Sequence, residues 1–261
     1  MLEQTKTYSA KAVVRTMIVD DGCIMLNVDS GRFYSSTGLG AQLWSQLVQK
    51  NRPATVIQLT SEITDGGSQL PDSALQDIKA FLENLESAGF ITSAANNKEL
   101  VEQQATQTAD ISVNPARAGL ATKIAAFCIG ALLRASRLTQ LFAAYWAIAT
   151  ADLIIKVGGF RALHRAVRNW PVSSYKAAGQ LTPEEILSAV DKASAFYRRK
   201  ARCLQRSCSA VWLLRAVGIP ARLIIGCRKL PFLAHAWVEI DNQVVGDSPL
   251  IKNLCTPMEC I

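Results

Sequence analysis

The sequence is short of several features that mark common protein classes. It contains only two histidines, His164 and His235, and none of its seven cysteines forms a Cys-x-x-Cys pair. An odd number of cysteines in a chain of 261 residues excludes a small disulfide-stapled secreted domain, and the missing pairs exclude a zinc ribbon. We therefore expect free thiols in a reducing compartment.

Long apolar runs are also missing. The first 15 residues contain no apolar segment after their first charges, so we expect no signal peptide. In the most apolar region, 120–155, the longest stretch without a charge runs from Leu138 to Ala151 and has 14 residues. A helix that spans a bilayer needs roughly 20. We expect a soluble, cytoplasmic protein without stable membrane insertion.

Charge is distributed unevenly. Residues 1–100 contain 8 Lys or Arg against 11 Asp or Glu, whereas residues 101–261 contain 20 against 10. This asymmetry favours two units with different partners. Nucleic acid is disfavoured, because the first unit is acidic and the second has no basic run with interleaved aromatics beyond Arg198–Lys200. An acidic peptide or protein, or plain solvation, fits the basic half better.

The first 92 residues read as a compact α+β module. Asp21-Gly22 and Ser30-Gly31 are typical of hairpin turns between short strands. Apolar residues at helical spacing follow, and Gly89 ends the last helix. The predicted strands are Val13–Asp20, Cys23–Asp29 and Arg32–Ser36, and the predicted helices are Leu39–Leu47, Pro53–Ile63 and Asp72–Ala88. Three strands and three helices resemble a winged helix-turn-helix.

A polar segment without aromatics, 93–118, is predicted to be a linker to a second domain, 119–261. This domain begins with helices at about 120–135, 137–156 and 160–168. Thr182-Pro183-Glu184-Glu185 predicts another helix start, since it combines an N-cap, a proline and acidic first-turn residues. A helix ending at Val217 and the strands Arg222–Cys227, Ala234–Ile240 and Gln243–Val245 complete an α+β pattern.

Cys203, His235 and Asp247 follow one another in an order that suits nucleophilic catalysis. Cys203 is predicted near a helix start among several arginines, an environment that lowers a thiol pKa. Only imidazole both accepts a thiol proton and returns it near neutral pH, and His235 lies between two small alanines. The start of the helix at Cys203 is inferred, since no clear breaker separates it from Glu185.

Hairpin geometry selects the acidic partner that would orient His235. Asp241 lies in the predicted turn, about 20 Å along the strand from His235. Asp247 returns on the partner strand. It shares a face with His235 only if the loop has an odd length or the strand contains a bulge. Asp247 is therefore favoured on that condition.

The remaining cysteines are interpreted as structural. Cys208 lies about 140° around the helix from Cys203, so both cannot face His235. Cys128, in an apolar helix, is expected in the core, and Cys227 is expected to be structural. The other three, Cys23, Cys255 and Cys260, are expected to be inert. A zinc site built from Cys203, Cys208, Cys227 and His235 is disfavoured by the spacing.

The segments that carry these residues resemble the lasso peptide maturation proteases, the B proteins of the transglutaminase-like (papain-like) cysteine protease superfamily. The resemblance lies in Cys203–Ser207, Leu213–Ala221, Ile225-Gly226 and Ala234–Asp247. The helical region 120–200 resembles that family less distinctively. The order and spacing of Cys203, His235 and Asp247 match the family and imply that they form its catalytic triad.

The first module is similar to PqqD-like peptide recognition elements, in Gly22–Asp29, Gly31–Tyr34 and Leu39–Trp44. That similarity implies that the leader of a precursor peptide adds as a strand along Arg32–Ser36, against the helix Asp72–Ala88. The leader-binding residues it implies are Arg32, Phe33, Tyr34, Ser35, Leu75, Lys79 and Leu82.

Together the two resemblances imply a leader peptidase with no cofactor of its own. It would release the core peptide to an asparagine-synthetase-like macrolactam synthetase that uses ATP. Two other functions stay open at this point. The triad would equally serve a transglutaminase-type acyl transfer, and the chain could instead be a non-catalytic leader-binding adaptor for the cyclase.

Overall fold

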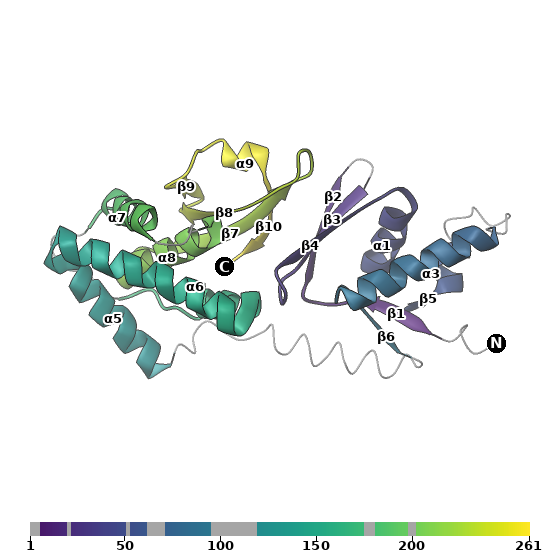
Figure 1. Ribbon diagram of the computed structural model, residues 1–261, viewed down its shortest axis with the longest axis horizontal. Coiled ribbons are helices and arrows are strands. Elements are labelled where there is room, and N and C mark those ends of the chain that lie inside the picture. Colours follow the sequence, from purple (N-terminus) through teal and green to yellow (C-terminus); the bar gives the residue numbers. More distant parts are fainter. Residues whose placement is uncertain are drawn as a thin grey trace. The chain divides into compact units, whose positions relative to one another are not determined.

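The computed structural model describes residues 6–19, 22–50, 53–61, 71–94, 119–174, 181–197 and 202–261. The chain divides into two compact units, Met1–Val113 and Asn114–Ile261 (Figure 1). Of the predicted linker 93–118, residues 95–118 lie outside the described residues. Its first two residues belong to a strand, so the predicted boundary at 92 falls inside an element.

The described part of the first unit contains two three-stranded antiparallel sheets and three helices. Its elements are β1 (Thr7–Ala10), β2 (Val14–Val19), β3 (Gly22–Asn27), β4 (Arg32–Thr37), α1 (Gly38–Lys50), β5 (Ala54–Thr55), α2 (Val56–Ser61), α3 (Asp72–Ser87) and β6 (Ile91–Ala94). The sheets have the strand orders β2-β3-β4 and β5-β1-β6.

The β2-β3-β4 meander and the three helices follow the predicted pattern, whereas the second sheet was not predicted. The helix expected from Pro53 begins only at Val56, because Ala54 and Thr55 pair with β1. The strands of this sheet are two to four residues long and far apart in sequence. Such strands leave no periodic signal. The description of this unit as a winged helix stays a prediction.

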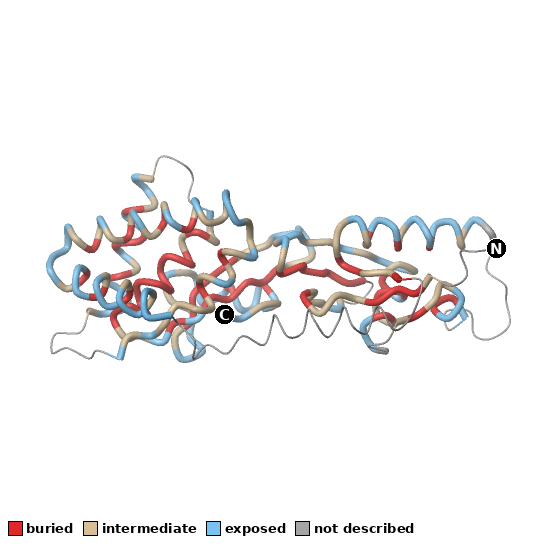
Figure 2. The backbone as a smooth tube through the Cα atoms, turned by 90° about the horizontal axis from the view of Figure 1, so that it is seen from below, coloured by how far each residue is buried: buried red, intermediate tan, exposed pale blue. Residues whose placement is uncertain are grey.

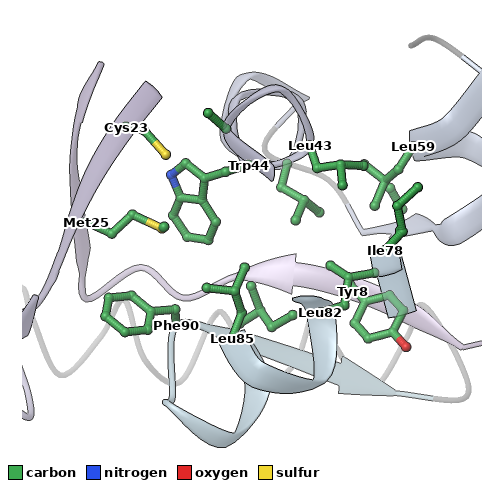
Figure 3. Close-up of a cluster of buried hydrophobic side chains, with 14 residues drawn as sticks. Tyr8, Cys23, Met25, Leu43, Trp44, Leu59, Ile78, Leu82, Leu85 and Phe90 are labelled. Carbon is green, nitrogen blue, oxygen red and sulfur yellow. The ribbon is translucent and has the colours of Figure 1, made fainter. Parts of the chain in front are cut away.

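The core of the first unit lies between the β-strands and the inner faces of α1 and α3 (Figure 3). Trp44 of α1 is fully buried, and its indole N–H donates a 3.0 Å hydrogen bond to the Thr16 hydroxyl. From α3, Ile78, Leu82 and Leu85 enter the same cluster. The indole N–H thus keeps a partner inside an apolar core.

The second unit combines helices with one four-stranded antiparallel sheet. Its elements are α5 (Leu120–Ala135), α6 (Arg137–Arg168), α7 (Pro183–Phe196), α8 (Cys203–Ala216), β7 (Ala221–Arg228), β8 (Leu233–Ile240), β9 (Gln243–Val245), α9 (Ile251–Leu254) and β10 (Thr256–Cys260). The strand order is β10-β7-β8-β9. An α+β architecture is therefore confirmed.

Local sequence signals explain the helix boundaries. Thr182 and Glu185 form the reciprocal capping box that starts α7. Gly159 has φ +70° and interrupts α6, which agrees with the two helices predicted on either side of it. Arg215, buried near the end of α8, donates hydrogen bonds to the carbonyls of Val167, Ala221 and Ile261 and so joins three segments.

Within the part of the chain that the structure describes, one helix, α6, is long and apolar enough to cross a membrane by length and composition. Its most apolar window has a mean hydropathy of 1.5, and 22% of that window is buried. The uncharged stretch identified in the sequence is shorter than this helix, because the helix continues through Asp152 and Lys156. One such helix is weak evidence for a span.

The packing of α3 makes a testable prediction. Truncating Leu82 to alanine removes a fully buried side chain, so we expect it to lower the free energy of unfolding by about 2–5 kcal/mol. The exposed Gln76→Ala on the same helix should change it by less than about 0.5 kcal/mol. Urea unfolding of the full chain, followed by circular dichroism, measures both. Equal midpoints would contradict this core.

Candidate active site

Cys203 is the first residue of α8, as the sequence analysis inferred. The preceding helix α7 ends at Phe196, and Tyr197 is extended. Arg202 is the N-cap and makes no capping hydrogen bond through its side chain. Cys203 therefore lies at the positive end of the helix dipole, and its thiol is partly exposed.

His235 and Asp247 are in direct contact with each other. His235 lies on β8, and its Nε2 is 2.7 Å from the Asp247 Oδ2. The backbone N–H of Ser248 donates to the other carboxylate oxygen, Oδ1, at 2.7 Å. Because Asp247 engages Nε2, the imidazole presents Nδ1 to the Cys203 thiol, with which it forms a hydrogen bond.

The way Asp247 reaches His235 differs from the predicted hairpin. The loop between β8 and β9 has two residues, Asp241 and Asn242, both with positive φ, so its length is even and the odd-length alternative does not apply. With Val238 paired to Val245, continued pairing would place Asp247 opposite Ala236. Pairing instead ends at Val245, and Gly246 turns the chain with φ +69°. That turn brings the carboxylate to His235.

The three side chains change one another's ionisation. Burial opposes ionisation of Cys203, but hydrogen bonds with His235 and with the backbone at Ala236 and Leu204 lower the pKa of its thiol overall. The hydrogen bond with Cys203 is the largest cause that raises the pKa of His235 to about 9. Asp247 adds to this and burial opposes it. Both shifts favour a thiolate–imidazolium pair over the neutral pair, relative to an isolated thiol and an isolated imidazole.

Asp247 itself is held in the charged state. Partial burial opposes ionisation, but the hydrogen bonds with His235 and the Ser248 amide lower the pKa of its carboxyl. Arg206 adds a favourable charge, and its guanidinium links α7 to this loop. It donates to the Asp191 Oδ1 at 2.7 Å and to the Gly246 carbonyl at 2.8 Å. The sequence analysis counted Arg206 only among the arginines near Cys203 and did not predict its contacts with Asp191 and Gly246.

Contacts around the three residues fix the helix against the strand. The Ser207 hydroxyl donates a 2.9 Å hydrogen bond to the Ala236 carbonyl, next to His235. The Trp237 ring is stacked with the His235 ring, with centroids 6.3 Å apart. A Cβ on Gly226, which is paired opposite His235, would lie 2.7 Å from that tryptophan. The close approach explains a glycine in the middle of β7.

The other cysteines are separated from this chemistry by burial or position. Cys208 is fully buried, which raises the pKa of its thiol. Burial also raises the pKa of the Cys227 thiol to about 11. The expectation for Cys128 is wrong: it is exposed, because the buried face of α5 consists of Ala126, Gly130 and Leu133. Within the described ranges, no cluster of three or more His, Cys, Asp or Glu side chains could hold a metal ion.

In the first unit, β4 is the candidate peptide-binding edge. It pairs with β3 on one side, and no described strand pairs with its other side. Tyr34 packs toward α3, with its ring centroid 6.4 Å from that of Phe81. Phe33 is adjacent on the strand and so lies on the opposite face. Tyr34, not Phe33, therefore lies on the face of β4 that α3 covers.

The other predicted leader-binding residues are not equally placed. Arg32, Ser35 and Lys79 are exposed, and Leu75 is half-buried. Leu82 is fully buried in the core of its unit, and its role as a leader contact stays a prediction. Phe81, which precedes it, is the half-buried residue beside Tyr34. Phe81 and Leu82 both belong to the apolar face predicted for α3. Periodicity alone does not show which residues of that face are fully buried and which lie at its partly exposed edge.

The ionisation of Cys203 yields a direct prediction. Its alkylation rate by iodoacetamide should reach half its plateau at a pH below 9.0, the ordinary thiol value, since the thiolate is stabilised. His235→Ala should move that midpoint upward. His164→Gln, which changes the other histidine, should leave it unchanged. Mass spectrometry of the Cys203 peptide measures each rate, and a midpoint insensitive to His235 would refute the ion pair.

Two families match this chain. The transglutaminase-like superfamily matches residues 146–258, and the family of coenzyme PQQ synthesis protein D (PqqD) matches residues 22–91. The first match contains Cys203, His235 and Asp247, and the second contains β4 and α3. The two domains recognised in the sequence are therefore confirmed at the family level.

Individual proteins match shorter regions. The microcin J25-processing protein McjB of Escherichia coli is 39% identical over 54 residues, which are 21% of this chain. The chain spans only about a quarter (26%) of that relative's length. A solved structure of TbiB1 in complex with the TbiA(beta) leader peptide is 19% identical, covering 32% of this chain and 93% of that one. Its TM-score of 0.28 is too low to support an argument. The chain therefore contains a region that matches the PqqD family, followed by a region that matches the transglutaminase-like superfamily, and part of it is similar to McjB.

Proposed function

We propose that this protein is the leader peptidase of lasso peptide maturation, a cysteine endopeptidase that binds a precursor by its leader and cuts the leader from the core. The observation that carries the proposal is the contact between Cys203, His235 and Asp247 inside the region that matches the transglutaminase-like superfamily. A paired thiolate and imidazolium, oriented by a carboxylate, is the arrangement that nucleophilic attack on an amide requires.

The chemistry follows from the positions of the two nitrogen atoms of His235. The Cys203 thiolate attacks the scissile carbonyl carbon, and the imidazolium donates its Nδ1 proton to the leaving amine as the C–N bond breaks. His235, now neutral, accepts a proton from water as the water attacks the thioester. Hydrolysis returns that proton to the Cys203–His235 pair and releases the leader carboxylate. Asp247 keeps Nε2 engaged throughout and stabilises the imidazolium.

Leader binding belongs, in this proposal, to the free edge of β4. Strand addition along Arg32–Ser36 would use main-chain hydrogen bonds for affinity, with Tyr34 and Phe81 contacting apolar leader side chains. Arg32, Ser35 and Lys79 are exposed beside that edge and helix, and Leu75 is half-buried. Docking would raise the effective concentration of the scissile bond at Cys203, because both domains belong to one chain.

The chemistry of the released core peptide indicates which enzyme acts on it next. Cleavage leaves a free α-amine on the core, and an amide bond from that amine to a side-chain carboxylate needs activation of the carboxylate. We assign that step to the asparagine-synthetase-like macrolactam synthetase and its ATP, in the cytoplasm. The proposed proteolysis itself uses only side chains of this chain and water.

Cleavage of a lasso precursor tests the triad. With the cyclase and ATP present, wild type and Cys208→Ala should both remove the leader, since Cys208 is buried away from the site. Cys203→Ala and His235→Ala should abolish removal, and Asp247→Asn should slow it at least 100-fold, about 3 kcal/mol of barrier. Mass spectrometry follows the core peptide.

The same assay separates the competing functions. Retained cleavage by Cys203→Ala would refute the assigned nucleophile. A leader-binding wild type that never cuts would favour an adaptor for the cyclase. A core or leader joined to an added amine, instead of hydrolysed, would favour a transglutaminase.

Strand addition makes its own prediction about the leader. N-methylation of single leader amides should weaken binding about five- to tenfold at alternate positions only, since alternate N–H groups of an added strand face β4. Fluorescence anisotropy with the full chain measures the dissociation constants, and Cys203→Ala should bind as wild type does. A uniform effect, or no effect at any position, would contradict strand addition.

A further inference from the structure

The second unit carries an apolar patch that the proposed protease does not use. It consists of Leu132, Leu138, Phe142, Trp146 and Phe196, each more than half exposed. Phe142 lines two adjoining hollows. One is about 970 Å³ and also contains Leu132 and Trp146, and the other is about 460 Å³ and also contains Leu138 and Phe196. Because Phe142 lines both hollows, the five residues form one continuous surface. Large exposed patches of this kind mark interaction sites.

The patch is held on a rigid corner between α5 and α6. Ser136 and Thr139 form a reciprocal capping box at the start of α6. The Thr139 hydroxyl and the Gln140 side-chain amide donate to the carbonyls of Leu132 and Leu133, at 2.7 and 3.0 Å. The rings of Phe142 and Trp146 are in edge contact, with centroids 6.0 Å apart. The exposed side chains are therefore presented by a fixed backbone.

Two of the helices that carry the patch, α5 and α6, are strongly basic, since residues 120–168 contain seven Lys or Arg and one Asp, a net charge of +6. The third, α7, contains three acidic residues and Lys192, so the three helices together have a net charge of +4. The one acidic side chain of α5 and α6, Asp152, is neutralised by Lys156 and accepts a hydrogen bond from the Tyr197 hydroxyl. Arg165 lines the larger hollow with Trp146. On α7, Glu184 and Glu185 line a neighbouring hollow, where Arg137 and Lys192 balance them. The surface suits an anionic partner.

The distribution of apolar side chains on α6 indicates a helix that lies on a membrane rather than one that crosses it. Gln140, Ala144, Ile148 and Ala151 form one buried face, and α6 packs against α7 and α8. Exposed and buried residues alternate along the helices of the second unit (Figure 2), and on α6 the side chains of Leu138, Phe142 and Trp146 are exposed. An exposed aromatic and aliphatic face, with cations along the same helices, is typical of interfacial binding. The most apolar window of α6 has a mean hydropathy of 1.5, and only 22% of it is buried.

We propose that the corner of α5 and α6 binds the surface of an anionic lipid bilayer, with the five-residue patch entering the headgroup region and the surrounding Lys and Arg facing lipid phosphates. The protein is held at the surface by two additive contributions, apolar burial and electrostatic attraction. This inference does not depend on the protease function, because neither Cys203 nor a precursor takes part in it.

Vesicle sedimentation of the full chain tests the proposal. Binding should be strong to phosphatidylcholine vesicles that contain phosphatidylglycerol, weak to phosphatidylcholine alone, and reduced by high salt. Phe142→Ser/Trp146→Ser should lower the partition coefficient at least about tenfold. The matched control Ile18→Ser/Ile57→Ser removes two comparably exposed apolar residues from the first unit and should bind as wild type does.

Three results would overturn the proposal: no binding to anionic vesicles, equal binding to neutral ones, or equal loss in both double variants. Light scattering of the same samples identifies the competing occupant. If the chain fails to bind vesicles but self-associates through the patch, with Phe142→Ser/Trp146→Ser restoring a monomer, the patch is an interface between two copies. The pH midpoint of Cys203 alkylation in each variant reports whether the fold is intact, because a lowered midpoint requires the contact between Cys203 and His235.

Discussion

Eleven of the fourteen residues of α8 are buried, because the helix packs against α5, α6 and α7 and against β7 and β8. Only its first turn reaches the surface, and that turn begins with Cys203. The hydrogen bond from Ser207 to the strand that carries His235 then determines how the thiol meets the imidazole. The position of the candidate nucleophile is thus a consequence of core packing, with no contribution from a flexible loop.

The charges of the site depend on this fixed contact. Burial alone would keep the Cys203 thiol neutral, as it does at Cys208. Hydrogen bonds with His235 and with backbone N–H groups reverse that effect at Cys203. Two thiols five residues apart on one helix therefore differ in ionisation because of their partners. A helix N-terminus without an imidazole partner would therefore not be sufficient to ionise the Cys203 thiol.

Much of this arrangement could be predicted from the sequence. Capping signals, hairpin dipeptides and helical periods located most elements, and the order of Cys203, His235 and Asp247 identified the residues that meet. The path of Asp247 could not be predicted, since it depends on the positive φ of Gly246 after a two-residue turn. The burial of Leu82 and the exposure of Cys128 were also missed. Periodicity defines a face of a helix, whereas only packing shows which part of that face is covered.

The free edge of β4 has a consequence for the protein when no peptide is bound. An edge strand with unpaired backbone N–H and C=O groups is a template for pairing with other chains, including misfolded copies of the same protein. β4 is short and begins with an exposed Arg32, a charge that disfavours pairing between identical edges, whereas its Phe33, Tyr34 and Thr37 favour strand pairing. Under the proposed function the same edge accepts the leader, so its charged first residue would have to limit pairing between copies without blocking that peptide.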